Sequence, residues 1–134
     1  MKRTKFLLSI FFVAAAIFVP SAEARTATYH RNISSRHLVA SVGYASYYSD
    51  YYNGRKTANG ERFSNSEYTA ASNQLPLGSR VRVTNLKNHC SVVVRVTDRG
   101  PYAKGRTIDL SRRAAEDIGM LQSGVAKVRI SQLS

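Results

Sequence analysis

Two carboxylic acids stand in segments whose neighbours suggest a chemical role. Asp98 ends a valine-rich stretch and enters an Arg-Gly-Pro turn. A carboxylate at such a strand end either accepts hydrogen bonds from turn amides or serves as a general acid and base in a groove. Glu61 follows Asn59-Gly60, a tight-turn signal, and precedes Phe63, which we expect to be buried. The Glu61 carboxylate either forms a surface ion pair or serves as a second catalytic carboxylate.

Tyrosines crowd the segment 44–52, which holds Tyr44, Tyr47, Tyr48, Tyr51 and Tyr52. Such rings either pack in a core or stack on sugar faces while their hydroxyls bind polar groups. Both alternatives remain open, and Tyr47 and Tyr48 are candidate substrate-binding residues.

Other candidates share the segments of the two acids. Asn59, Arg99 and Tyr102 are expected to bind substrate beside them. Asp109 precedes a predicted helix N-terminus, where negative charge is favoured, and we interpret it as structural.

The sequence gives little support for a metal site or a nucleophilic cysteine. His30 and His37 have no third ligand near them in sequence. Cys90, the only cysteine, cannot form a disulfide within the chain, and beside His89 it lacks the orienting group that an activated thiol needs. We expect no metal and no cofactor.

The charge balance indicates the type of partner. The chain of 134 residues carries 20 Lys and Arg against 8 Asp and Glu, a net charge of +12. These cations are scattered instead of being clustered on one element among base-stacking groups, so we expect no nucleic-acid partner. An anionic polymer of the cell envelope is the better counterpart.

The N-terminus has the pattern of a secretory signal. Lys2, Arg3 and Lys5 precede an apolar run that ends in Ala22-Glu23-Ala24, so we expect a cleaved signal peptide over 1–24. The run is shorter than the roughly 20 residues of a membrane span, so we expect no stable membrane insertion. With no cysteine near the cleavage site, we expect a periplasmic or secreted protein, not a lipoprotein. Residues 25–40 lack hydrophobic period and are interpreted as a flexible lead-in.

The remainder, 41–134, is predicted to be one small all-β domain and a monomer. Alternation of polar residues and valine predicts strands over 80–84 and 90–97, which form a hairpin. Further strands are expected over 42–48, 68–71, 107–110 and 126–130. One helix should begin after Ser111 as N-cap and end at Gly119. About six short strands in so small a domain favour a closed barrel.

Five motifs occur in a family-specific order. They are "TANGE", "LPLG", "VTNL", "V-x-DRGP" and "DLS-x-x-AA", between about Val42 and Ile130. In wording and order they resemble the rare lipoprotein A (RlpA) family. The resemblance implies a six-stranded double-psi β-barrel and an endolytic lytic transglycosylase acting on the glycan strands of peptidoglycan.

The resemblance also implies site residues and a reaction. The family's acidic residues match Asp98 and Glu61. One acid would protonate the oxygen between N-acetylmuramic acid and N-acetylglucosamine, then accept the proton of the muramoyl 6-hydroxyl as a 1,6-anhydro end forms. We assign this role to Asp98, with Glu61 as second carboxylate; the reverse assignment stays open.

One departure from the family pattern supports another function. Where many members read "TAAH", this chain has Ser72, which cannot carry a charge but can still hydrogen bond to substrate. The alternative is a non-catalytic, expansin-like module that binds peptidoglycan or another carbohydrate.

Overall fold

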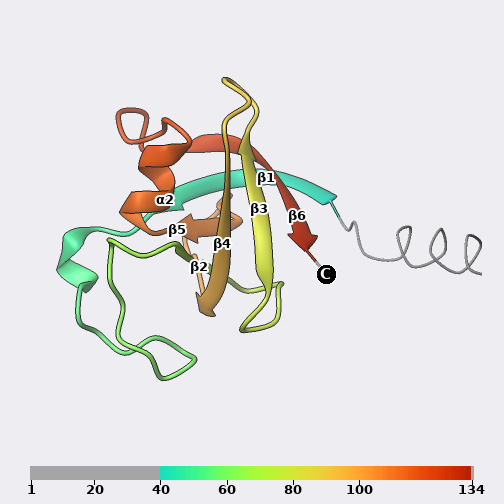
Figure 1. Ribbon diagram of the computed structural model, residues 1–134. Coiled ribbons are helices and arrows are strands. Elements are labelled where there is room, and N and C mark those ends of the chain that lie inside the picture. Colours follow the sequence, from blue (N-terminus) through green and yellow to red (C-terminus); the bar gives the residue numbers. More distant parts are fainter. Residues whose placement is uncertain (1–39, 134) are drawn as a thin grey trace, which may run out of the picture. The chain divides into compact units, whose positions relative to one another are not determined.

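The structure, a computed structural model, describes residues 40–133 (Figure 1). The predicted signal peptide, 1–24, and residues 25–39 of the predicted lead-in lie outside the described residues. Ala40, expected to belong to the lead-in, is the first residue of a strand.

Six strands close into a barrel with one short α-helix beside it. The elements are β1 (Ala40–Tyr47), the 3-10 turn η1 (Asp50–Tyr52), β2 (Thr69–Ser72), β3 (Arg80–Asn85), β4 (Ser91–Asp98), β5 (Ile108–Leu110), α2 (Arg112–Asp117) and β6 (Ala126–Leu133). Around the barrel the strand order is β1-β5-β2-β4-β3-β6. β1 pairs with β5 and β2 with β4 in parallel, and the other neighbours are antiparallel. The prediction of an all-β six-stranded barrel with one short helix is confirmed.

The barrel interior is filled mainly by β-branched side chains. The buried valines of the β3–β4 hairpin are Val81, Val83, Val92, Val94 and Val96. Arg80 and Arg82, which alternate with the valines of β3, are exposed. Val83 stands opposite Val92, so the predicted hairpin and its inward face are confirmed. Period-2 alternation therefore specifies which side of the wall each residue faces.

At the end of β4 this alternation is interrupted. Continued alternation would turn Asp98 toward the core, as it does Val96. The register between β2 and β4 shifts instead: Ala70 pairs with Val96, and the next residue, Ala71, pairs with Asp98. The extra residue, Thr97, is buried, and Asp98 is partly exposed. Such a bulge re-aims a side chain, here the carboxyl of Asp98.

The register also sets one row of residues across four neighbouring strands. Ser46 on β1 pairs with Asp109 on β5, Asp109 pairs with Ala71 on β2, and Ala71 pairs with Asp98 on β4. Two strand spacings separate the two aspartates, roughly 9–10 Å between their backbones. Only the methyl group of Ala71 stands between them in the row.

Helix α2 begins and ends as its sequence predicts. The side chain of Ser111, the N-cap, accepts a hydrogen bond from the N–H of Ala114. Gly119 follows the C-cap with a φ of 68°, in the left-handed region that glycine tolerates. Ala114 and Ala115 are buried against the core. Within residues 40–133 no helix has the length and apolar character needed to cross a bilayer.

The segment between β1 and β2 leaves the barrel as a long loop, and its internal pairing was not predicted from the sequence. After η1 the chain folds back on itself through a bridge between Lys56 and Arg62 and paired backbone bonds between Gly54, Arg55 and Phe63. Figure 1 shows this segment running outside the strands as a long loop. It supplies one wall of the site described below.

Replacing Ser111 with alanine should destabilise the domain by about 1–2 kcal/mol, because the helix loses its cap and the buried N–H of Ala114 loses its acceptor. Denaturant unfolding of the variant measures the change. The exposed Ser66→Ala serves as the control and should stay within about 0.5 kcal/mol of wild type. Equal stability of the two variants would contradict the capping role.

Candidate active site

A groove of about 740 Å³ opens beside the row of residues on β1, β5, β2 and β4. Its walls come from the end of β1, from η1 and the following loop, and from the segment after β4. It is lined by Tyr47, Tyr48, Ser49, Tyr52, Arg55, Lys56, Thr57, Phe63, Asp98, Arg99, Gly100, Pro101, Tyr102, Ala103, Arg106 and Asp109.

Asp98 lies in this groove and is held by three donors. One carboxylate oxygen accepts the backbone N–H groups of Ala58 and Arg99, both at 2.9 Å. The other accepts the hydroxyl of Tyr48 at 2.8 Å. The sequence left a choice between an amide-bonded carboxylate and one that faces a groove. The structure combines the two, because the bonded carboxylate also lines the cavity.

Asp109 is the second carboxyl group of the groove. Its neighbours Ile108 and Leu110 are fully buried in the core, so alternation turns Asp109 to the other side of the wall, where it lines the groove. Burial raises the pKa of the Asp109 carboxyl, partly offset by a hydrogen bond from the Ser46 hydroxyl and by the charge of Arg106. We interpreted Asp109 as structural, and its alternation within β5 was the signal that could have placed it in a groove.

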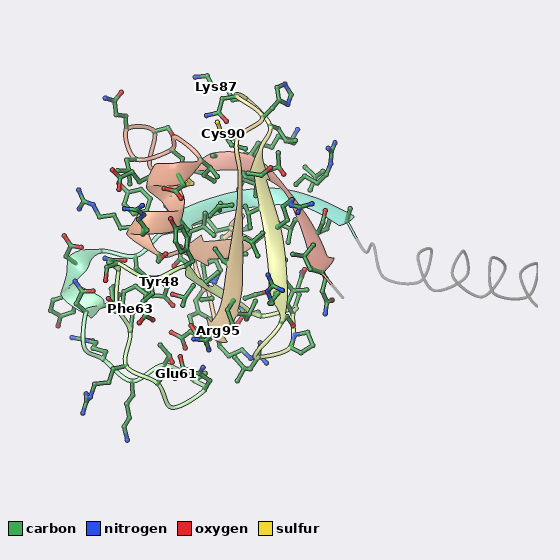
Figure 2. All side chains as sticks on the ribbon, in the orientation of Figure 1. Tyr48, Glu61, Phe63, Lys87, Cys90 and Arg95 are labelled. Carbon is green, nitrogen blue, oxygen red and sulfur yellow. The ribbon has the colours of Figure 1, made fainter. Side chains whose placement is uncertain are left out.

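An aromatic wall stands beside the two acids. The Tyr48 ring packs on Phe63 at 4.4 Å between centroids (Figure 2). It also packs on Tyr52, at 5.4 Å between centroids. Burial, followed by the hydrogen bond to Asp98, raises the pKa of Tyr48, so its hydroxyl keeps its proton and donates to the carboxylate. Phe63 is buried, as expected.

The tyrosines divide between the two roles that the sequence left open. The Tyr47 hydroxyl donates to the carbonyl of Leu121 at 2.9 Å, which anchors a partly buried ring at the groove. Tyr102 is 84% exposed at the rim, and Tyr51 is 71% exposed within η1. Some rings therefore pack and others are free to contact a ligand.

Four cations line the groove against its two carboxylates. Arg99 is engaged in the fold, since its guanidinium donates to the carbonyls of Ser72 and Leu75 at 2.9 and 2.6 Å. Arg55 stacks over the Tyr51 ring at 4.1 Å. Lys56 and Arg106 complete the set. The excess of positive charge suits a ligand with anionic groups.

Glu61 does not line the groove. Its carboxylate forms a two-pronged ion pair with Arg95 of β4, at 2.9 and 2.8 Å (Figure 2). Hydrogen bonding to Arg95 lowers the pKa of Glu61, so the group stays ionised near neutral pH and is a poor proton donor. An ion pair was one of the two alternatives for Glu61, and its partner is Arg95 on β4.

Asn59 and Ser72 also lie outside the groove lining. The Asn59 side chain accepts the N–H of Glu61 at 3.0 Å and the hydroxyl of Thr57, so it shapes the turn. Ser72 is buried, and its hydroxyl oxygen accepts the backbone N–H groups of Gln74 and Leu75 at 3.2 Å. Of the predicted site residues, the groove lining includes Asp98, Tyr47, Tyr48, Arg99 and Tyr102 and leaves out Glu61, Asn59 and Ser72.

Comparison with known families agrees with this barrel and its motifs. Residues 40–130 match the model of the family described as lytic transglycolase. The chain belongs to this family, the double-psi β-barrel family of RlpA. It is 56% identical over 88 residues to an endolytic peptidoglycan transglycosylase RlpA from Pasteurella multocida, covering 66% of this chain and 30% of that protein. It is 38% identical over 148 residues to the RlpA of Neisseria meningitidis serogroup A, covering 98% and 62%. The chain thus spans about three-tenths of the length of the first of these relatives.

Solved structures share the barrel. The Streptomyces papain inhibitor superposes with a TM-score of 0.60 at 25% identity, covering 74% of this chain and 98% of that one. An expansin from Clavibacter michiganensis gives a TM-score of 0.58 at 20% identity, covering 72% and 51%. The expansin likeness shows the fold alone.

In this RlpA-family domain the signature motifs have structural roles. The segment "TANGE" supplies the N–H of Ala58 to Asp98, and its Glu61 is tied to Arg95 on the barrel wall. The backbone N–H of Asn59 also bonds to the carbonyl of Thr97, beside Asp98. The ion pair of Glu61 therefore holds the loop that positions the groove carboxylate.

A pH titration should find the Asp109 carboxyl above the ordinary aspartate pKa, because burial disfavours its ionised form. Ser46→Ala should raise the pKa further, since the Ser46 hydroxyl donates to the carboxylate. Carboxyl-carbon NMR measures both. Ser91→Ala, whose hydroxyl bonds to Thr84 on the β3–β4 hairpin, should leave the value unchanged. A midpoint at or below the ordinary aspartate value would contradict the assignment.

Proposed function

We propose that this domain cleaves the glycan strands of peptidoglycan as a lytic transglycosylase, outside the cytoplasm. The observation that carries the proposal is a pair of aspartates on either side of Ala71 in one cation-rich groove. The related RlpA proteins are named endolytic peptidoglycan transglycosylases, although this chain spans only part of their length. A monomer and a periplasmic or secreted location stay predictions from the sequence.

The first step needs a protonated acid next to the glycosidic oxygen. Asp109 is the better candidate, because burial raises its pKa and so keeps it protonated to higher pH. It would donate its proton to the oxygen between N-acetylmuramic acid and N-acetylglucosamine as positive charge develops at C1. Asp98, held by three donors with its charge facing the groove, would stabilise that charge.

The second step returns the proton. The carboxylate of Asp109 accepts the proton of the muramoyl 6-hydroxyl, whose oxygen bonds to C1. The product is a 1,6-anhydro end, and no water molecule is consumed. One residue therefore acts first as acid and then as base. This requires a carboxyl group that can both donate and accept a proton at the working pH.

This division of roles differs from the one expected from sequence. There Asp98 was the acid and base, with Glu61 as second carboxylate, and that assignment remains a prediction. The groove supports Asp109 in the proton-transfer role because it lies beside Asp98, whereas Glu61 is paired with Arg95 outside the lining. Glu61 is then a positioning residue that acts through the loop at Ala58.

The walls of the groove suit a sugar polymer. The rings of Tyr48, Tyr52 and Tyr102 offer faces for stacking on sugar rings and hydroxyls for hydrogen bonds. Lys56 and Arg106 are placed to bind the carboxylate that muramic acid carries when its peptide has been removed. Strands stripped of peptides are therefore the substrate that we propose.

Asp109→Asn should reduce the release of anhydro-ended saccharides from stripped glycan by about 10²–10⁴-fold, because the acid and base is lost. Its melting temperature at neutral pH should equal or exceed that of wild type. The raised pKa means that the folded state holds the proton more tightly, so ionisation of Asp109 costs stability as the pH rises.

Mass spectrometry of the digests measures the products. Asp98→Asn, which keeps an oxygen to accept the two backbone N–H groups, is measured alongside Asp109→Asn. A stable Asp109→Asn with wild-type rates would contradict the role of Asp109. Binding of sacculi by wild type with no anhydro product would favour the expansin-like alternative.

Glu61→Gln and Arg95→Gln should lower the cleavage rate by similar factors, because either change breaks the ion pair that holds the loop at Ala58. If Glu61 acts only through Arg95, the double variant should be no slower than either single variant. Rates on stripped glycan complete this double-mutant cycle. A severe loss in Glu61→Gln with a near-normal Arg95→Gln would instead make Glu61 a catalytic residue.

A further inference from the structure

The barrel wall formed by β1, β6 and β3 carries a second cluster of cations, away from the groove. Arg80 and Arg82 on β3 and Lys127 and Arg129 on β6 are all exposed. They alternate with the buried Val81, Val83, Val128 and Ile130, so all four point outward from one wall. We call these four residues, with Val42 and Tyr44 of β1, the basic face.

The register brings these side chains together. Arg129 stands opposite Val42 on one side and opposite Thr84 on the other, which makes Arg82 its diagonal neighbour, roughly 7–8 Å away. Lys127 stands opposite Tyr44. The basic face is therefore continuous across three adjacent strands.

Within residues 40–133 no ion pair compensates the charge of this surface. The ranges of β1, β3 and β6 contain no Asp or Glu. The ion pairs formed among residues 40–133 involve Arg95, Arg112 and Arg113 and leave out these four cations. Like charges at this spacing repel each other, so an anionic partner would relieve a cost that the folded chain leaves uncompensated.

The basic face also has an apolar component. Tyr44 is 48% exposed and Val42 55% exposed, directly beside Lys127 and Arg129. A tyrosine ring on a pleated sheet offers a stacking surface for a sugar ring, and arginines next to it can bind carboxylates in two-pronged fashion. A polymer of sugars that carries carboxylates matches both components.

The position in the barrel separates the four cations of this surface from the groove, whereas β1 borders both. In the closed order β1-β5-β2-β4-β3-β6, β3 lies opposite β5 and β6 lies opposite β2. Asp109 is on β5, and Ala71, between the two aspartates, is on β2. A glycan strand on the basic face would thus leave the groove open for another strand or another stretch of the same one.

We propose that the basic face is a second, non-catalytic binding surface for anionic glycan. It holds the domain on the polymer independently of the groove. The choice of peptidoglycan as this polymer rests on the proposed function.

The test is a pelleting assay of the full chain with purified sacculi at increasing NaCl, next to the cleavage of short soluble stripped glycans. Arg82→Gln/Arg129→Gln should weaken sacculus binding about fivefold at low salt and flatten its salt dependence, with unchanged cleavage of the soluble glycans. Tyr44→Thr should weaken binding without changing the salt dependence. Arg112→Gln/Arg113→Gln removes the same number of positive charges from exposed positions on α2, outside the basic face and the groove lining, and should bind like wild type.

Wild-type binding by Arg82→Gln/Arg129→Gln, or an equal loss in the control, would overturn the proposal. The same variant is also tested for binding to phosphatidylglycerol vesicles. If it loses binding to the vesicles but not to sacculi, the partner is a membrane surface and the proposal is likewise overturned. A wild-type chain that binds sacculi through this face but releases no anhydro product would refute the proposed function and leave the basic face standing.

Discussion

The register shift between β2 and β4 is the constraint on which the groove depends. β4 is a strand of alternating buried valines, and uninterrupted alternation would direct Asp98 into the hydrocarbon core, where an ionised carboxylate is costly. One extra residue, Thr97, occupies the buried position instead. Asp98 then emerges beside the loop that follows η1, where the N–H of Ala58 and the hydroxyl of Tyr48 meet it.

Backbone pairing, not side-chain contact, sets the distance between the two groove acids. Asp98 and Asp109 both pair with Ala71, from opposite sides of β2. All four residues of β2 are buried, so this strand is also part of the core. The loops add what the barrel lacks: the 3-10 turn and the segment to Phe63 supply the aromatic wall, and the segment after Asp98 supplies the opposite rim.

Much of the fold could be predicted because its signals are local. Valine alternation, the Ser111 cap and the Gly119 terminus identify the hairpin and the helix from short windows of sequence. Asp98, Tyr47 and Tyr48 could be predicted as groove residues for the same reason, since a strand end and a run of tyrosines are visible without the fold. The place of Asp109 in the same groove as Asp98 could not be predicted from short windows, because it follows from the pairing of both residues with Ala71 on β2, a strand far from β5 in sequence.

The interaction partner of Glu61 could not be predicted for a related reason. Its turn was evident, but its partner, Arg95, lies on another strand, and no local pattern identifies such a pair. Ser72 illustrates the reverse case. Its place in the motif suggested a hydroxyl that binds a ligand. In the structure Ser72 is buried, and its hydroxyl oxygen accepts hydrogen bonds from the backbone of the next turn.

Because strand β2 belongs to the core and also spaces the acids, its sequence is constrained twice. A larger residue at Ala71, which is fully buried, would have to displace neighbouring atoms as well as fill the gap between the carboxyl groups. Divergence in substrate choice among such barrels should therefore accumulate outside the strands, in the segments 49–63 and 99–106. New specificities could then evolve in these loops while the spacing of the two aspartates is inherited intact.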